Sequence, residues 1–426
     1  MKSKLPFLLA LAFFLITFFW LWGDRMVAEA DVIQYAAAKQ DFQVIPTLSA
    51  TPTPPGVGPG SSGPLDDPIN YLPYVVYLQP PKTPTPRPTS TPTATATQLW
   101  SIQRVDAVHS FSDMTNRSLR LTSNGLPRIA YGGSQLYYAA YNGSSWLIQI
   151  VDPSNNVGKF ASLALDSQGN PHISYYDAAQ KQLKYARWTG SAWDISVVDS
   201  AEDVGMYSSI ALDNAGRPNI SYLNNTSGTL KFARWTGSSW TIQTVDTVKV
   251  GKYTSLALDP NNLIYISHFD SMNGNLKFAQ YTGSAWDLQV IDIRDKVGMY
   301  TSIALGTNNY PYISYYDDTN DDLKYAYWTG STWVVSTIDS TSTVGLYTSI
   351  AMDSTGKPSI AYYDIAAGDL KYARWNGSTW VIQVVDSSGN VGQFASLALD
   401  SLGRPHISYY DAGNVDLMYA VKLTPP

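Results

Sequence analysis

From Trp100 onward, the chain consists of short runs in which apolar residues alternate with polar ones. One stretch holds four such runs, at residues 162–166 (SLALD), 171–177 (PHISYYD), 183–188 (LKYARW) and 193–199 (WDISVVD). Successive side chains of a strand point to opposite faces, so Val, Ile, Tyr and Trp at every second position predict four β-strands. No apolar stripe with the period of a helix persists, because turn residues interrupt the runs at short intervals.

The same set of runs recurs along the rest of the chain. Seven tryptophans stand 46 or 47 residues apart, namely Trp100, Trp146, Trp193, Trp240, Trp286, Trp333 and Trp380. A period of about 40 to 50 residues that contains several short strands and polar turns is typical of a β-propeller. We therefore predict an all-β protein, a seven-bladed β-propeller built from four-stranded antiparallel blades.

The phase of the repeat predicts how the ring closes. Residues 100–106 (WSIQRVD) match a fourth strand without the first three, and the chain ends after Tyr419 with three strands and no fourth. An open array would leave unpaired strand edges, and pairing residues 100–106 beside residues 417–421 removes them. The propeller is therefore expected to span residues 99–423.

Residue size indicates which strand of each unit is innermost. The first run of every unit carries a serine, at Ser118, Ser162, Ser209, Ser255, Ser302, Ser349 and Ser396. Blades converge on a central axis, so the innermost strand has the least room and the outer strands need Trp and Tyr to fill the space between sheets. Most of the aromatic residues are thus interpreted as core.

The first 98 residues differ in composition and predict export. Two lysines precede an apolar run at residues 5–22, and residues 28–30 (AEA) offer a small-residue cleavage site. Residues 1–30 are expected to be a signal peptide or an N-terminal membrane anchor, with cleavage left open. Residues 31–98 predict an extended Pro/Thr-rich stalk that contains a short apolar segment at 65–80. The propeller is therefore expected outside the cytoplasmic membrane, secreted or anchored and facing outward.

Cysteine content and charge exclude several kinds of chemistry. The chain has no cysteine, which excludes disulfides, thiol catalysis and CxxC metal sites. A formal net charge of −6 argues against a nucleic-acid partner, which would require a basic face. No cofactor and no metal site are predicted, and a monomer is expected.

One face of the predicted ring combines carboxylates with aromatic side chains. The loops after the second and fourth strands of a blade open on the same side, and they follow the YYD and VVD motifs. The candidate ligand-binding residues on this side are Asp177, Asp270, Asp317, Asp364, Asp411, Tyr207, Tyr253, Tyr300 and Tyr347, with Phe160 and Phe394 also near the channel mouth. Stacking surfaces beside oriented acceptors suit a sugar or a peptide. The alternative is that each aspartate caps its own turn.

Three local resemblances accompany this pattern. The hairpin at 186–193 (ARWTGSAW) and its copies resemble the Asp-box hairpin of sialidase-type propellers, with Gly190 and Trp193 in register and Trp188 in place of the box aspartate. The same W-x-G-x-x-W turn resembles blades of fucose-binding propeller lectins. The whole arrangement of export segment, stalk and propeller resembles uncharacterised bacterial surface propellers, Chloroflexi-like in linker style.

These observations lead to a prediction of function by interaction. The polar residues that could perform chemistry recur blade by blade, whereas catalysis in a propeller normally needs one blade to differ, so the chain is predicted not to be an enzyme. We predict a protein-interaction or adhesion scaffold that binds an extracellular protein or glycan. The alternatives are a lectin-like glycan-binding module with repeated sites and a glycoside hydrolase or lyase, because propellers host all of these functions.

Overall fold

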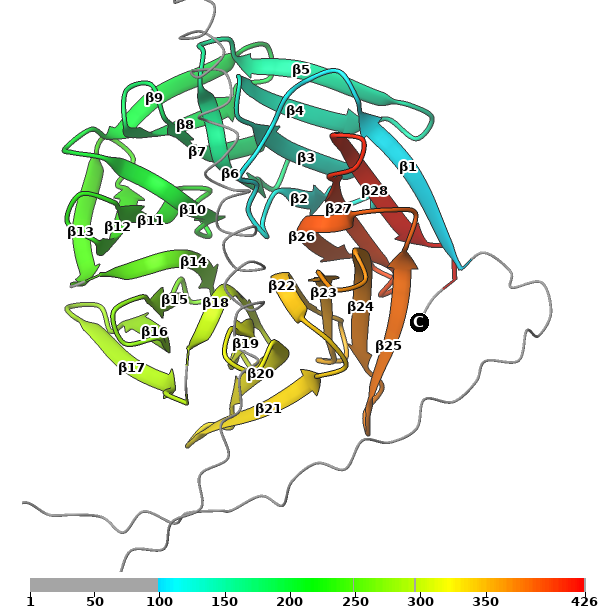
Figure 1. The fold of residues 1–426 in the computed structure, drawn as a ribbon. Coiled ribbons are helices and arrows are strands. Elements are labelled where there is room, and N and C mark those ends of the chain that lie inside the picture. The colour runs from blue at the N-terminus through cyan, green and yellow to red at the C-terminus, as the bar shows by residue number, and fades with distance from the viewer. Residues whose placement is uncertain (1–98, 248, 295, 425–426) are drawn as a thin grey trace, which may run out of the picture. The chain divides into compact units, whose positions relative to one another are not determined.

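The computed structural model describes residues 99–424 apart from 248 and 295, and these residues form 28 strands and no helix. The strands lie in seven sheets around a central channel (Figure 1). The predicted signal or anchor at 1–30, the stalk at 31–98 and its apolar segment at 65–80 fall outside the described residues. Within the described part of the chain, no helix is long and apolar enough to cross a membrane.

Each blade contributes one strand to each of four concentric positions. The innermost strands are β2 (Leu119–Leu121), β6 (Val157–Leu165), β10 (Val204–Leu212), β14 (Val250–Leu258), β18 (Val297–Leu305), β22 (Val344–Met352) and β26 (Val391–Leu399). The second strands are β3 (Pro127–Gly132), β7 (Pro171–Asp177), β11 (Pro218–Asn224), β15 (Ile264–Asp270), β19 (Pro311–Asp317), β23 (Pro358–Asp364) and β27 (Pro405–Asp411).

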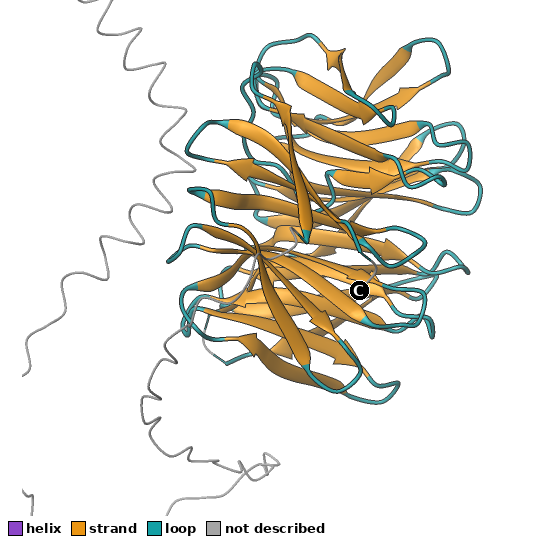
Figure 2. Cartoon of the chain, turned by 90° about the vertical axis from the view of Figure 1, so that its right-hand side faces the viewer, coloured by secondary structure: helices purple, strands orange, loops and turns teal. Residues whose placement is uncertain are grey.

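The two outer positions complete the blades. The third strands are β4 (Leu136–Tyr141), β8 (Gln182–Trp188), β12 (Thr229–Trp235), β16 (Asn275–Tyr281), β20 (Asp322–Trp328), β24 (Asp369–Trp375) and β28 (Asp416–Lys422). The fourth strands are β1 (Trp100–Asp106), β5 (Trp146–Asp152), β9 (Trp193–Asp199), β13 (Trp240–Asp246), β17 (Trp286–Asp292), β21 (Trp333–Asp339) and β25 (Trp380–Asp386). Blades 1 to 6 begin at β2, β6, β10, β14, β18 and β22, and the loops gather on two opposite sides of the ring (Figure 2).

The predicted closure of the ring is confirmed. Blade 7 has the strand order β1-β28-β27-β26, so the first strand of the chain completes a sheet made by the last three. The pairing is antiparallel and runs from Trp100 opposite Lys422 to Asp106 opposite Leu417, with one irregularity near Asp106. No blade of the described ring therefore depends on a strand from another molecule.

The repeated tryptophans pack between blades. Each one meets an aromatic ring on the third strand of the preceding blade, with ring centroids 5.1–5.5 Å apart and steeply inclined planes. The pairs are Trp146 with Tyr419, Trp193 with Tyr138, Trp240 with Tyr185, Trp286 with Phe232, Trp333 with Phe278, Trp380 with Tyr325 and Trp100 with Tyr372. Edge-to-face contacts of this kind stabilise beyond the apolar area they bury. The 46- or 47-residue period thus encodes the blade-to-blade contact.

The inner-strand serines do more than fit a narrow space. The Ser162 hydroxyl accepts a hydrogen bond from the backbone N–H of Ile210 in the next blade, at 3.1 Å. Five further contacts at 3.0–3.2 Å repeat this arrangement from Ser209 round to Ser396. The free edge of each inner strand faces the channel, where an unpaired N–H would be costly. Serine at this position is therefore a hydrogen-bonding link between blades.

A second link joins the end of each fourth strand to the following blade. The buried Asp152 carboxylate accepts hydrogen bonds from the Tyr175 hydroxyl at 2.7 Å and from the Lys184 ammonium at 2.6 Å. Burial alone would raise the pKa of Asp152, but these bonds lower it to about 2. In blade 4, His268 replaces the tyrosine and contacts Asp246 at 3.0 Å. These carboxylates of the VVD motif are structural ties.

Blade 1 departs from the repeat and fills the channel. Its short inner strand is preceded by a segment, residues 113–117, that we call the plug. The side-chain amide of Asn116 donates to the backbone carbonyls of Thr301 and Thr348 at 2.9 and 3.2 Å. The backbone carbonyl of Asn116 accepts from the hydroxyls of Ser349 and Ser396, each at 3.0 Å. The plug thereby connects blade 1 to blades on the opposite side of the ring.

The next residue of the plug extends these contacts. The Arg117 guanidinium donates to the Ser255 hydroxyl at 3.1 Å and to the Ile303 carbonyl. The Arg117 carbonyl accepts from the backbone N–H of Leu163 at 2.9 Å, where the other blades use a serine hydroxyl. The plug therefore replaces the regular serine link in the one blade whose inner strand is short.

Closure by β1 can be tested by truncation. A chain that begins at residue 99 should unfold cooperatively, whereas a chain that begins at residue 108 loses β1 and should melt at a lower temperature. The physical reason is the exposed edge of β28 and the lost burial of Trp100, whose removal alone costs about 3–5 kcal/mol. Equal melting temperatures for the two truncations would contradict this account of closure.

The plug predicts that a single channel residue stabilises the whole ring. Arg117→Met should destabilise the protein by about 1–3 kcal/mol, because the acceptors at Ser255 and Ile303 lose their donor. The matched control is Arg187→Met on the outer strand β8, where the arginine is half exposed and pairs with Asp194. Exposed pairs contribute about 0–1 kcal/mol, so chemical denaturation should separate the two variants clearly. An Arg117→Met variant as stable as the wild type would show that Arg117 does not stabilise the ring.

Candidate functional site

The carboxylates of the YYD motif are buried at the ends of the second strands. Asp177, Asp270, Asp317, Asp364 and Asp411 are each 2–5% exposed. Their oxygens accept hydrogen bonds from the turn that follows them. Asp317, for example, accepts from the backbone N–H groups of Thr319 and Asn320 at 3.1 Å and from the Asn320 amide at 3.0 Å. These contacts are those expected of the turn-capping alternative.

The aromatic residues of the same face form a ring around the channel mouth, which we call the collar. Its members are Phe160, Tyr207, Tyr253, Tyr300, Tyr347 and Phe394. Neighbouring rings lie 4.5–4.9 Å apart between centroids, and all six side chains are half-buried. All six residues have φ between 52° and 55°, a left-handed conformation that costs free energy in a bulky residue. The repeated geometry of the first strands imposes this conformation.

The collar hydroxyls are engaged with one another. Burial, followed by the interaction with Tyr253, raises the pKa of Tyr300 well above its usual value, and Tyr300 also shares a hydrogen bond with Tyr347. Blade 1 supplies Asp113 instead of an aromatic ring, with φ of 52° and its carboxylate 3.5 Å from the Lys159 ammonium. The channel mouth is thus an aromatic ring with a single ion pair, closed below by the plug.

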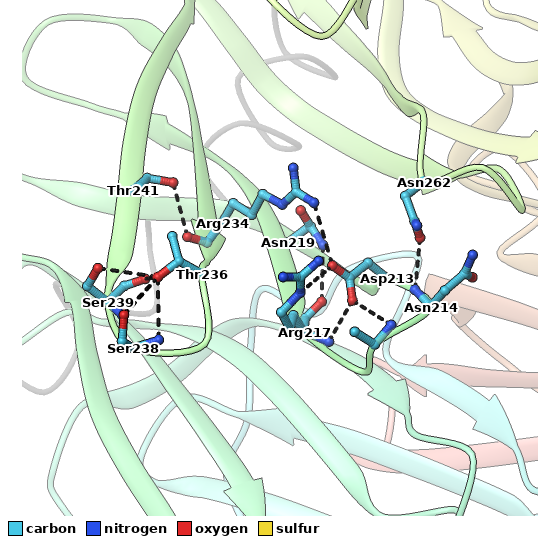
Figure 3. A network of polar contacts seen from close by, with 11 residues as sticks. Asp213, Asn214, Arg217, Asn219, Arg234, Thr236, Ser238, Ser239, Thr241 and Asn262 are labelled. Atoms are coloured by element: carbon cyan, nitrogen blue, oxygen red, sulfur yellow. Dashed lines mark hydrogen bonds and ion pairs between the residues drawn. The ribbon is translucent and has the colours of Figure 1, made fainter.

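The opposite face carries a pocket between blades 3 and 4, with a volume of about 440 Å³. Its lining residues, which define the blade 3–4 pocket, are Arg217, Phe232, Arg234, Thr236, Thr241, Gln243, Ile264 and Tyr281. Arg217 belongs to the turn between β10 and β11, whereas Arg234 is the penultimate residue of β12, and Figure 3 shows both side chains directed at Asp213. Pockets of about 300–1,000 Å³ are typical for small ligands.

Two arginines in this pocket share one carboxylate. Asp213 accepts from the Arg217 Nε at 2.8 Å, and the Arg234 guanidinium lies 3.7 Å away. Burial alone would raise the pKa of Asp213, but hydrogen bonds from the backbone and side chain of Arg217 lower it, so the carboxylate stays ionised. Both guanidinium groups remain about one-third exposed. The cluster therefore carries one excess positive charge that faces the pocket.

A comparison with blade 2 shows why the charge is uncompensated. There, Arg187 occupies the position of Arg234 and binds Asp194 on the neighbouring strand, with Nε and Nη2 each 3.0 Å from one carboxylate oxygen. In blade 3 the residue opposite Arg234 is Thr241, whose hydroxyl donates to the Arg234 carbonyl instead. Blade 2 therefore differs from this pocket in two ways: it has the acid Asp194, and it has Asn170 in place of Arg217.

The rest of the pocket wall is aromatic and amide in character. Phe232 and Tyr281 come from adjacent blades, and Gln243 holds the Trp286 indole N–H through its side-chain oxygen at 3.0 Å. The Gln243 amide nitrogen is a donor that this bond does not use. The pocket thus combines two guanidinium groups, an amide donor and apolar surface. Such a pocket can bind an acidic, ring-shaped polar ligand.

From the sequence, polar residues were considered only as features that recur blade by blade, and this pocket was therefore not predicted. Arg217 and Arg234 are 17 positions apart and converge only through the turn and strand geometry of the blade. The available signal was that blade 3 has arginine both in the turn after its first strand and in its third strand, with Thr241 after its fourth-strand tryptophan where blade 2 has Asp194.

The histidines contact neighbouring polar side chains within hydrogen-bond distance. His172 and His406 contact the hydroxyls of Tyr185 and Tyr419, both at 2.5 Å, and His109 contacts Asp106 at 2.7 Å. Burial lowers the pKa of His172, His268 and His406. In the part of the chain that the structure describes, no three His or acidic residues gather as metal ligands would.

Comparison with known proteins identifies the fold but assigns the chain to no family. No family model and no curated protein matches the chain. Among solved structures, an ulvan lyase bound to a saccharide of glucuronic acid and sulfated rhamnose matches at 13% identity with a TM-score of 0.54, covering 76% of this chain and 96% of its own. A fucose-specific lectin from Aleuria aurantia matches at 16% identity with a TM-score of 0.44, covering 66% and 98%. A Dyadobacter fermentans protein of unknown function matches at 12% identity with a TM-score of 0.46, covering 62% and 93%.

These likenesses correct one sequence-based prediction. The chain was predicted not to be an enzyme because its polar residues recur by blade, yet polysaccharide lyases share this ring of blades. The structure also shows that blade 1 and the blade 3–4 pocket break the repeat, so repetition does not exclude catalysis. What the comparisons establish is the propeller fold, shared with ulvan lyases; they support neither a bacterial nor a Chloroflexi-like assignment.

Proposed function

We propose that the propeller binds an acidic saccharide, such as a uronic acid or a sulfated sugar, in the blade 3–4 pocket. The observation that carries this proposal is the pair Arg217 and Arg234 sharing the single carboxylate of Asp213. A guanidinium group binds a carboxylate or sulfate through two parallel hydrogen bonds, which gives both charge and orientation. A ligand acid group would supply the negative charge that the cluster lacks.

The remaining surfaces of the pocket suit a sugar ring. The apolar face of a pyranose can lie against Phe232 or Tyr281, while its hydroxyls meet Thr236, Thr241 and the Gln243 amide. The volume of about 440 Å³ leaves room for one or two sugar units. Both arginines are exposed enough to reach a ligand without moving the buried core.

One structural comparison supports this proposal. The ulvan lyase with the same fold is named for a polysaccharide, and its bound saccharide contains glucuronic acid and sulfated rhamnose. Its ring of blades therefore provides a precedent for acidic saccharides, and lyase action on such a ligand is the second candidate function. An extracytoplasmic location, as predicted from residues 1–30, would give the propeller access to polysaccharides. The protein-interaction scaffold stays a prediction.

Removal of one cation should weaken binding of an acidic ligand selectively. We expect the wild-type protein to bind trigalacturonate more tightly than neutral maltotriose. Arg234→Gln should lower the affinity for trigalacturonate about 10- to 100-fold, because a charge-assisted hydrogen bond contributes about 1.5–3 kcal/mol. The control is Arg187→Gln at the same strand position in blade 2. Titration calorimetry measures both, and ultraviolet absorbance of the mixtures would detect unsaturated lyase products.

Equal affinities of the wild type for the acidic and neutral sugars would contradict the proposal. So would an Arg187→Gln variant that loses as much affinity as Arg234→Gln. Turnover of trigalacturonate that disappears with Arg234→Gln would assign lyase action to the same pocket.

A second variant neutralises the pocket without removing an arginine. Thr241→Asp places an acid where blade 2 has Asp194, so Arg234 should form the cross-strand pair seen at Arg187 and release the ligand. We expect a loss of trigalacturonate binding similar to that of Arg234→Gln, with an unchanged melting temperature because Thr241 is exposed. The control, Asp194→Thr, lies in the neighbouring blade and should leave binding in this pocket intact. Unaltered binding by Thr241→Asp would show that excess charge does not drive recognition.

A further inference from the structure

The junction between blade 6 and blade 7 repeats the charged arrangement of the blade 3–4 pocket. The corresponding residues are Asp353, Lys357, Arg374 and Gln383, which stand where blade 3 has Asp213, Arg217, Arg234 and Gln243. The Arg374 guanidinium lies 3.5 Å from the Asp353 carboxylate, and Asp353 also caps its own turn through the backbone N–H of Lys357 at 2.9 Å. Two cations again accompany a single acid.

A third cation is added because this junction is where the ring closes. In the other six blades an aromatic residue ends the third strand and contacts the fourth-strand tryptophan, but β28 ends at Lys422, opposite Trp100. Lys422 is only 8% exposed, and in residues 99–424 apart from 248 and 295 no acidic partner lies within ion-pair distance of its ammonium group. Burial, followed by repulsion from Arg374, lowers the pKa of Lys422.

Two polar atoms at the same junction are buried without a partner among the described residues. They are the indole Nε1 of Trp100 and the side-chain Oε1 of Gln383. In four other blades the corresponding tryptophan donates to the corresponding glutamine at 2.9–3.3 Å. Buried polar groups that lack a partner are uncommon and costly, so the missing hydrogen bond needs a physical reason.

The charge balance supplies that reason. Lys357, Arg374 and Lys422 bring three positive charges to a place where Asp353 brings one negative charge. A buried ammonium next to a guanidinium is unfavourable unless an anion compensates it. Trp100 lies opposite Lys422 in the strand pair, and its indole N–H has no partner among the described residues. An oxyanion would satisfy both the excess charge and this donor.

We propose that the blade 6–7 junction is a second anion site, which holds a carboxylate or sulfate group between Lys422, Arg374 and the Trp100 indole. Its extension to a saccharide rests on the function proposed for the blade 3–4 pocket, since both sites lie at equivalent places on one face. A bound anion bridges blade 6 to the strand pair β1 and β28, so occupancy also strengthens the closure of the ring. A long acidic polysaccharide then engages one propeller at two points and gains avidity.

The first experiment counts the sites on the full chain by titration calorimetry with trigalacturonate, which is too short to bridge them. The wild type should bind two equivalents, whereas Lys422→Met and Arg234→Gln should each bind one and the double variant none. Lys422→Met keeps the length of the side chain and removes only the charge. A second variant, Lys357→Met at the half-buried rim, guards against misfolding and should weaken the same site about 10-fold.

The outcomes separate this inference from the proposed function. If the wild type binds one equivalent of trigalacturonate, and Arg234→Gln loses it while Lys422→Met keeps it, the site at the blade 6–7 junction is overturned and the blade 3–4 pocket is supported. One equivalent that is lost only in Lys422→Met supports the second site and overturns the first. Two equivalents that persist in Lys422→Met and in Lys357→Met overturn the inference as well.

Inorganic sulfate distinguishes a saccharide site from a simple anion site. Sulfate should raise the melting temperature of the wild type by more than that of Arg234→Gln or of Lys422→Met, because each anion site of the native protein adds its own stabilisation. A sulfate effect without any trigalacturonate binding at the junction would limit the site to small anions. Equal sulfate stabilisation of wild type and Lys422→Met would contradict an anion at the closing junction.

Discussion

Contact between successive blades is the constraint on which this structure depends. A single four-stranded blade cannot bury both of its faces, and each tryptophan of a fourth strand packs edge-to-face against an aromatic ring of the preceding blade. The inner strands are likewise satisfied by hydroxyls of their neighbours. Such a chain is stable only when the last blade meets the first, which β1 achieves by completing the sheet of β26–β28.

Against this regular background, the exceptions to the repeat mark where function is proposed. Blade 1 gives up a regular inner strand and fills the channel with Asn116 and Arg117. Blade 3 brings Arg217 and Arg234 together and has Thr241 where blade 2 has an acid. Blade 7 ends in Lys422 where the other blades end in an aromatic residue. The first exception stabilises the ring, and the other two leave positive charge between blades, where acidic ligands would be held by two sheets at once.

The sequence predicts the fold well because strand period, repeat length and phase are local properties. The seven tryptophans and the fourth strand at 100–106 were sufficient to infer blade number and closure, and the structure confirms both. The role of Ser162 and its equivalents was assigned to size alone, because their partners are 48 positions away. The proposed pocket was missed because it depends on a turn, a strand end and an absent acid that meet only in three dimensions. The aspartates of the YYD motif were noticed as polar groups, but burial commits their oxygens to their own turns.

The most direct test of the central claim is a crystal structure of the protein with trigalacturonate. We expect one carboxylate of the ligand to lie within hydrogen-bond distance of both Arg217 and Arg234, with a sugar ring against Phe232 or Tyr281. Ligand bound only at the collar around the channel mouth, with the blade 3–4 pocket empty, would contradict it.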